Sequence, residues 1–170
     1  IISFVKDARL LGVEKDTEKR YEGQRSWDFD VKHQGYRYHM SNIFAAIGRE
    51  QLKKINSIEK KRKEIVNYYL ENLKNIPQIQ TLDFDFKSII SHIFVVKTSK
   101  RDELREFLLS KNIECGIHYK PNHLLTKYKS DALPITEKVY EEILTLPCQL
   151  DLVKEEQDFV INSIKEFFNA

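Results

Sequence analysis

The sequence predicts an α/β chain rich in helix, and three observations carry this prediction. Only five of the 170 residues are glycine, so backbone positions suited to tight turns are few. Apolar residues recur every three or four positions from residue 41 toward Pro77, which predicts one long helix. Beyond Pro77, short β-branched and aromatic runs alternate with amphipathic segments, the pattern of alternating strands and helices.

The N-terminal 40 residues are expected to be irregular. A short helix is predicted from Ser3 to Val13, followed by a polar stretch from Glu14 to Gln34 that contains several turn formers. A polar connection of this length is usually functional or marks a domain boundary. We therefore expect residues 1–40 to be the remnant of a preceding domain with its linker, and residues 41–170 to form a domain of their own.

The long helix should begin at Ser41 or Asn42, because either side chain is a good N-cap. It should end before Pro77, since the residue preceding a proline disfavours helical geometry. At about 30 residues it would be long for a globular domain, where helices average ~10–14 residues. This length suggests a helix that bridges two units.

The rest of the chain is expected to alternate. Strands are predicted from Ser91 to Thr98 and from Ile113 to Tyr119, and helices from Lys100 to Lys111, Pro134 to Leu144 and Lys154 to Phe168. Leu146-Pro147 should break the chain after the second of these helices. The residues expected to face the core are Leu104, Phe107 and Leu108 in the first helix, and Phe159, Val160, Ile164, Phe167 and Phe168 in the last.

Composition excludes several functional classes. The 28 basic and 26 acidic residues nearly cancel, so no overall field favours nucleic acid. The basic stretch Lys53–Lys63 is interleaved with glutamates and lacks aromatic residues for stacking on bases, so we expect a solvated helix face. No apolar run reaches the ~18 residues of a membrane span. Two cysteines are too few for a disulfide framework and favour a reduced, cytoplasmic chain.

One candidate site is the segment from Gly35 to Asn42. Arg37 offers a planar fork of donors that suits a phosphate, and the adjacent helix start favours an anion. Tyr36, Tyr38 and His39 can stack on a ring or donate hydrogen bonds. The alternative is an aromatic-rich loop that only packs in front of the helix.

A second candidate is the run from His118 to His123. Pro121 should make the loop rigid, so that His118, Tyr119 and His123 face one pocket. Zinc is disfavoured, because strand alternation places Cys115 and His118 on opposite faces and a fourth ligand is missing. The alternative is a surface loop with incidental histidines.

These segments, in this order, resemble the DegT/DnrJ/StrS-type sugar-nucleotide aminotransferases. Each motif alone is weak, whereas the ordered set covers almost the whole chain. The matching stretches are Gly35–Asn42 with the following Ala45-Ala46 and Gln51-Leu52, Ser91–Val96, Arg101–Leu104, Ile113–His123, Leu133-Pro134 and Leu146-Pro147.

The resemblance implies the aspartate aminotransferase fold (fold type I), with a large domain that binds pyridoxal phosphate and a smaller C-terminal domain. This chain would be the C-terminal part: a long bridging helix and a small, mostly antiparallel sheet covered by helices. The full enzyme would be a homodimer with active sites at the subunit interface. It would transfer an amino group, from a donor such as glutamate, to a nucleotide-linked keto sugar in amino-sugar biosynthesis, for surface polysaccharide or a similar product.

The resemblance also implies roles for individual residues. Arg37 stands where the family has an Asn that reaches the cofactor phosphate of the neighbouring subunit, and His39 stands where it has an Arg. Substrate contacts are implied for Tyr36, Tyr38, His39, His118, Tyr119 and His123. No catalytic residue is expected in this chain, because Lys6 does not have the spacing of the family's Schiff-base lysine.

Two other functions stay open at this point. In a dehydratase branch of the same family, a histidine replaces the Schiff-base lysine, and that position is outside this chain. The chain could also be a non-enzymatic dimerisation or interaction module that kept only the small domain. The absence of an initiator Met suggests a fragment or a processed chain, and an isolated fragment without the lysine would be inactive.

Overall fold

The computed structural model describes residues 1–13 and 30–169. The contacts within the chain divide it into two units, Ile1–Lys53 and Lys54–Ala170. The predicted polar stretch from Glu14 to Gln34 lies mostly outside the described residues, which resume at Asp30. No helix in the described part of the chain is both long and apolar enough to cross a membrane.

The first unit contains two helices, α1 (Ile2–Ala8) and α3 (Asn42–Leu52), neither of which has a buried residue. The helix predicted from Ser3 to Val13 is confirmed but is shorter, because α1 ends at Ala8. The backbone then turns through Leu11 and Gly12, both of which have left-handed φ angles. Gly35 packs against this turn, where an added Cβ would lie 1.9 Å from the amide nitrogen of Gly12. Only glycine fits this close approach of two backbones.

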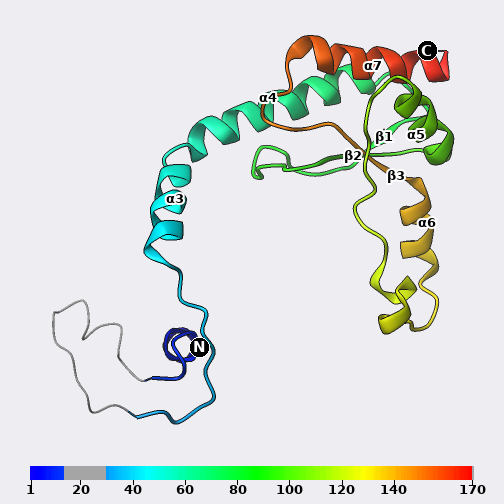
Figure 1. The fold of residues 1–170 in the computed structure, drawn as a ribbon. Coiled ribbons are helices and arrows are strands. Elements are labelled where there is room, and N and C mark those ends of the chain that lie inside the picture. The colour runs from blue at the N-terminus through cyan, green and yellow to red at the C-terminus, as the bar shows by residue number, and fades with distance from the viewer. Residues whose placement is uncertain (14–29, 170) are drawn as a thin grey trace. The chain divides into compact units, whose positions relative to one another are not determined.

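The helix predicted from residue 41 to Pro77 is two helices. Ser41 is the N-cap of α3, and its Oγ accepts a hydrogen bond from the Phe44 amide at 3.3 Å. The helix ends at Leu52, and α4 (Ile55–Leu73) begins after the turn at residues 53–54 (Figure 1). Both residues of this turn are lysines, which are good helix formers, so no local signal predicted the break.

The second unit contains a three-stranded antiparallel sheet in the order β1-β2-β3. Its strands are β1 (Gln80–Thr81), β2 (Phe94–Lys97) and β3 (Ile143–Leu146). Val96 of the central strand lies opposite Thr81 on one side and Leu144 on the other. The expected small, mostly antiparallel sheet is confirmed.

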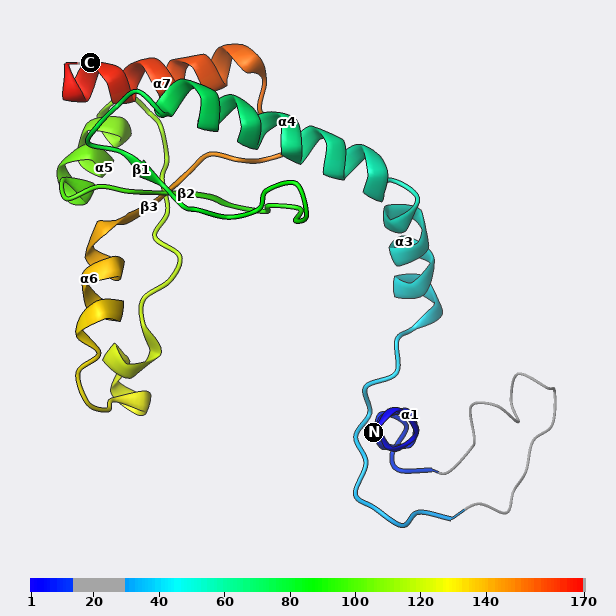
Figure 2. The same cartoon turned by 180° about the vertical axis from the view of Figure 1, so that it is seen from behind.

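Three helices pack with this sheet to form the core of the second unit. α7 (Lys154–Phe168) lies beside α4 and contacts α5 (Arg101–Ser110), which also contacts β3 (Figures 1 and 2). Burial of these apolar faces is the main source of stability. The most buried large side chains are Val66, Tyr69, Leu73, Phe94, Val96, Leu104, Leu108, Leu144, Leu146, Ile161 and Ile164.

The bounds of α7 agree with the prediction, and those of α5 differ by one residue at each end. Among the predicted core residues, Phe159 is exposed, and Phe107, Phe167 and Phe168 are only partly buried.

The strand predicted from Ile113 to Tyr119 is wrong. This segment makes only one isolated bridge, between Gly116 and Thr145. The helix predicted from Pro134 to Leu144 is observed as α6 (Pro134–Glu142). It ends two residues early because the chain continues directly into β3. All four residues of β3 are buried, so its short apolar run lacks the alternation by which a strand is recognised.

Candidate functional site

The candidate segment Tyr36–His39 belongs to the first unit, where its backbone is held and its side chains are exposed. The amide of Tyr36 donates to Ala8 O at 2.6 Å, and the amide of Tyr38 donates to Arg9 O at 2.9 Å. All four side chains are exposed to solvent. A fixed backbone with free side chains is suited to binding a ligand or a partner surface.

Within this segment the two tyrosines pack on each other, and the Arg37 side chain has no polar partner among the described residues. The rings of Tyr36 and Tyr38 stack with centroids 5.5 Å apart and planes 23° apart. Among the described residues, Arg37 makes no side-chain hydrogen bond or ion pair. Its five guanidinium donors are therefore available, and such a donor set fits a phosphate group.

In the second unit, His118 and Tyr119 lie after the isolated bridge at Gly116. The Nδ1 atom of His118 lies 2.9 Å from Thr145 Oγ1, within hydrogen-bond distance. The two rings meet edge to face with centroids 4.8 Å apart. His118 is half-buried and Tyr119 is exposed, so both side chains are accessible from outside.

His123 is buried and paired, in contrast to the other two. It lies in the short helix η1 (Asn122–Leu124), and its Nε2 is 3.0 Å from Glu137 Oε1 on α6. Glu137 also accepts a hydrogen bond from the Leu133 amide at 2.9 Å. That backbone bond first, and the His123 contact second, hold the pKa of Glu137 below its usual range. In this structure His123 joins η1 to α6, and its role toward a substrate stays a prediction.

An apolar cavity of about 440 Å³ opens beside His118. Its walls come from the loop between β1 and β2, from the sheet and from α6. The side chains that define its character are Phe84, Phe86, Ile89, Ile90, Val139 and Ile143. Two histidines, His92 and His118, also line the cavity.

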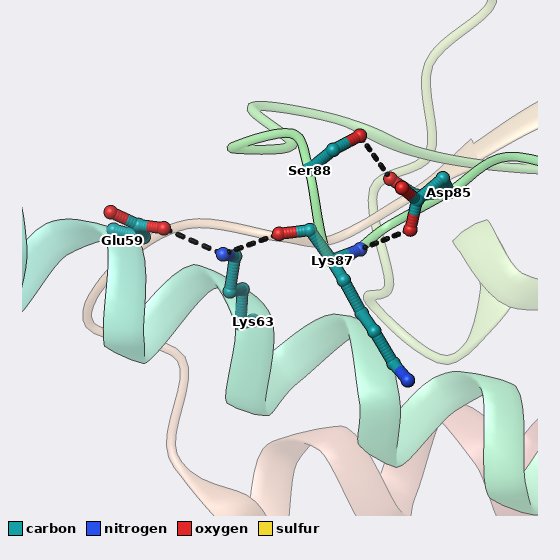
Figure 3. A network of polar contacts seen from close by, with 5 residues as sticks. All are labelled: Glu59, Lys63, Asp85, Lys87 and Ser88. Atoms are coloured by element: carbon teal, nitrogen blue, oxygen red, sulfur yellow. Dashed lines mark hydrogen bonds and ion pairs between the residues drawn. The ribbon is translucent and has the colours of Figure 1, made fainter.

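The loop that forms one wall of this cavity is attached to α4 (Figure 3). Lys63 Nζ donates to Glu59 Oε1 at 2.6 Å and to the backbone oxygen of Lys87 at 2.7 Å. Within the loop, Asp85 Oδ1 accepts from the Lys87 amide at 3.1 Å, and Ser88 Oγ donates to Asp85 O at 3.0 Å. Lys63 therefore joins the helix to a loop with its own internal hydrogen bonds.

Arg62, the neighbour of Lys63, attaches the far end of the same loop. Its Nη1 donates to His92 O at 2.9 Å and also to Cys148 O. The expected solvated face of Lys53–Lys63 is thus wrong for these two residues, both of which are partly buried. Long cationic side chains can reach distant carbonyls, whereas helical spacing alone does not reveal such contacts.

The two cysteines are free, and their surroundings do not favour thiolates. Burial raises the pKa of the Cys115 thiol to about 11, and burial also raises the pKa of Cys148. Across residues 1–13 and 30–169, no group of three or more His, Cys, Asp or Glu side chains is placed to hold a metal ion.

Sequence reasoning missed the residues that support these side chains. Thr145 is buried in β3, and Gly116 lies beside the His118 ring. Glu137 had a detectable signal, because an acidic residue one turn after Pro134 is typical of a helix start. Thr145 and Gly116 had none, since their role depends on a pairing between segments about 30 residues apart.

The comparison with protein families gives one decisive match. The DegT/DnrJ/EryC1/StrS aminotransferase family matches residues 3–165. The chain belongs to this family. The order of motifs from Gly35–Asn42 to Leu146-Pro147 had predicted this membership.

Two curated relatives of this chain are transaminases for nucleotide-linked amino sugars. The chain is 29% identical over 151 residues to UDP-4-amino-4,6-dideoxy-N-acetyl-beta-L-altrosamine transaminase of Campylobacter jejuni, covering 83% of this chain and 40% of that protein. It is 28% identical over 141 residues to dTDP-3-amino-3,6-dideoxy-alpha-D-galactopyranose transaminase of Aneurinibacillus thermoaerophilus, covering 78% and 38%. A third relative is the spore coat polysaccharide biosynthesis protein SpsC of Bacillus subtilis, at 27% identity, covering 92% and 44%. The chain therefore spans less than half the length of these relatives.

A solved structure supports the fold. Spr1654 of Streptococcus pneumoniae in its PMP-form superposes with a TM-score of 0.78 at 27% identity, covering 96% of this chain and 44% of that chain. The same protein has been solved in a PLP-form, with a TM-score of 0.77. This chain thus has the mixed α/β fold of the corresponding part of Spr1654, a protein solved with the pyridoxal phosphate cofactor in its PLP-form and PMP-form.

Proposed function

We propose that this chain is the C-terminal part of a pyridoxal-phosphate-dependent aminotransferase that acts on nucleotide-linked keto sugars. The observation that carries the proposal is the family match over residues 3–165, together with relatives that aminate UDP- and dTDP-linked sugars. Residues 1–40 would be the end of the large cofactor-binding domain, and residues 41–170 the small domain. The similarity to SpsC supports a product destined for a surface polysaccharide.

Arg37 would contact the cofactor phosphate of the neighbouring subunit. When bound, pyridoxal phosphate supplies the electron sink for amino transfer. The contribution of this chain would be to bind and orient: the guanidinium of Arg37 is exposed and unpaired among the described residues, and its neighbours fix the backbone beneath it. An Arg in place of the family's Asn would bind the phosphate through two parallel hydrogen bonds.

The other candidate residues would contact the substrate. Tyr36 and Tyr38 would offer ring faces and hydroxyls to the nucleotide sugar, and His39 a ring nitrogen. His118 lines the apolar cavity of the second unit, and Tyr119, the next residue in the chain, is exposed. For His123 the proposal requires that a ligand displace or extend its pairing with Glu137.

A homodimer in the cytoplasm, with glutamate as amino donor, completes the proposal. Support for the dimer comes from the first unit, whose helices α1 and α3 bury no residue. The exposed apolar side chains on these helices include Ile2, Phe4, Val5, Ile43, Phe44 and Ile47. Apolar surface of this kind is usually covered by another domain or subunit.

Amino transfer by the chain extended with the residues encoded upstream of Ile1 would test this function. The assay follows 2-oxoglutarate released from glutamate in the presence of a UDP-linked 4-keto sugar and pyridoxal phosphate. The extended chain is expected to turn over, and the 170-residue chain alone is not. Turnover by the 170-residue chain would contradict the assignment of this chain as a partial enzyme, and no turnover by the extended chain would contradict the proposed reaction.

The role of Arg37 has its own test in the extended chain. Arg37→Met is expected to weaken pyridoxal phosphate binding about tenfold or more, because it removes charge-assisted hydrogen bonds worth roughly 1.5–3 kcal/mol. Arg49→Met, which changes an exposed arginine on α3, serves as the matched control. Cofactor titration by absorbance distinguishes the two, and equal affinities would rule out the role of Arg37.

A further inference from the structure

The ring of His118 is held on two sides by residues to which no function has been assigned. On one side, a Cβ added at Gly116 would lie 2.4 Å from His118 Cε1, so any larger residue there would force the ring out of its present position. On the other side, Thr145 Oγ1 lies 2.9 Å from Nδ1. Gly116 and Thr145 are joined by two backbone hydrogen bonds, of 3.0 and 2.8 Å, which fix the space between them.

The direction of the His118–Thr145 hydrogen bond follows from burial. Thr145 is only 6% exposed, and within the described residues its Oγ1 has no other hydrogen-bond partner. A buried hydroxyl proton without an acceptor is costly, so Thr145 donates and Nδ1 of His118 accepts. A neutral imidazole carries one proton, which must then reside on Nε2.

We propose that Thr145 and Gly116 are positioning residues that hold His118 as its Nε2–H tautomer and so present a hydrogen-bond donor at the apolar cavity. The group that accepts this bond would be a ligand oxygen of a hydroxyl, carbonyl or phosphate. Few polar groups line the cavity, so a hydrogen bond formed there competes with little water. The inference rests on the proposed function only in assigning that oxygen to the nucleotide sugar.

Nitrogen NMR of the 170-residue chain tests the tautomer directly. With the imidazole neutral, the wild type and Thr145→Ser are expected to show protonated Nε2 and a hydrogen-bonded, unprotonated Nδ1. In Thr145→Val the Nδ1 resonance should move downfield as it loses its donor. Thr98→Val, a second buried threonine whose Oγ1 accepts from the Lys100 amide, should leave His118 unchanged. Protonation of His118 at Nδ1, or wild-type resonances in Thr145→Val, would overturn the proposal.

The steric half of the proposal has a separate test. Gly116→Ala should displace the ring and abolish the nuclear Overhauser contact between the His118 ring and the Thr145 side chain. Gly48→Ala is the matched control, because a Cβ there meets nothing within 4 Å. A ring contact that persists in Gly116→Ala would refute this role. If that variant does not fold, the Thr145 series still decides the tautomer.

The consequence for substrate is measured in the upstream-extended chain. Thr145→Val should raise KM for the keto sugar nucleotide about tenfold, and Thr145→Ser should restore it. Unchanged KM in Thr145→Val would contradict the link to substrate. The NMR result does not depend on the reaction, so a fixed Nε2–H tautomer without any amino transfer would reject the proposed function and leave the positioning of His118 standing.

Discussion

The two units of this chain differ in where their apolar side chains lie. In the first unit, helices α1 and α3 bury no residue, and their large apolar side chains face solvent. In the second unit, α4, α5, α7 and the sheet enclose one continuous core. The difference shows that amphipathic sequence alone does not make a self-sufficient unit. The second unit has its own buried core as a source of stability, whereas α1 and α3 have no buried core within the described part of the chain.

The largest expected effect on the free energy of unfolding is the loss of a buried phenylalanine in the second unit, which an exposed phenylalanine in the first unit controls. Phe94 on β2 is 1% exposed and Phe44 on α3 is 68% exposed. Phe94→Ala should lower the free energy of unfolding by about 3–5 kcal/mol, because it leaves a cavity in the core. Phe44→Ala should change it by less than about 0.5 kcal/mol. Urea denaturation followed by circular dichroism measures both, and similar losses would break the comparison.

A smaller effect is expected from the contacts that attach the loop between β1 and β2. Arg62→Met keeps an apolar stem but removes the donors to His92 O and Cys148 O. The loss should be about 1.5–3 kcal/mol, the range for hydrogen bonds from a charged group. Lys60→Met, an exposed neighbour on α4, is the control and should be near neutral. If the two variants unfold at the same urea concentration, Arg62 does not stabilise the second unit.

The first unit offers a change of opposite sign. Gly48→Ala in α3 adds a methyl group that meets no other atom within 4 Å and favours helix by up to about 1 kcal/mol. Hydrogen exchange of the α3 amides should slow, while the urea midpoint of the second unit stays at its wild-type value. A shift of that midpoint would mean that the two units unfold together.

The smallest effect concerns pH and the Glu137 carboxylate. Its pKa is lowered by the Leu133 amide and then by His123, so it contributes stability above its unfolded value, about 4.3. That stability is lost as the pH falls through the lower, folded value. Glu137→Gln should therefore show a smaller drop in Tm between pH 7 and pH 3 than the wild type. Glu141→Gln on the same helix should keep the wild-type drop; equal pH dependence in all three chains would contradict the prediction.

The helices were the most predictable part of the fold. α7 has the predicted bounds because Val160 and Ile164 follow helical spacing and point into the core. β3 was missed because all four of its residues are buried, which removes the alternation that distinguishes a strand. The break at residues 53–54 was missed because both residues are lysines, which favour helix.

The candidate site was predictable as a set of residue types and less so as an arrangement. Arg37 and its tyrosines were recognised from the sequence, and their exposure suits a binding segment. His123 shows the limit of such reasoning, since its pairing with Glu137 depends on where α6 begins. Ligand-facing residues carry local signals, whereas the residues that orient them depend on tertiary pairing.

Lys63 and Arg62 hold the loop between β1 and β2 through the backbone oxygens of Lys87 and His92. A carbonyl oxygen is the same whichever side chain its residue carries. Substitutions along this loop can therefore alter the lining of the cavity without releasing the loop from α4. Side chains of this loop that set which ligand the cavity accepts can thus change, while Lys63 and Arg62 keep the loop in place.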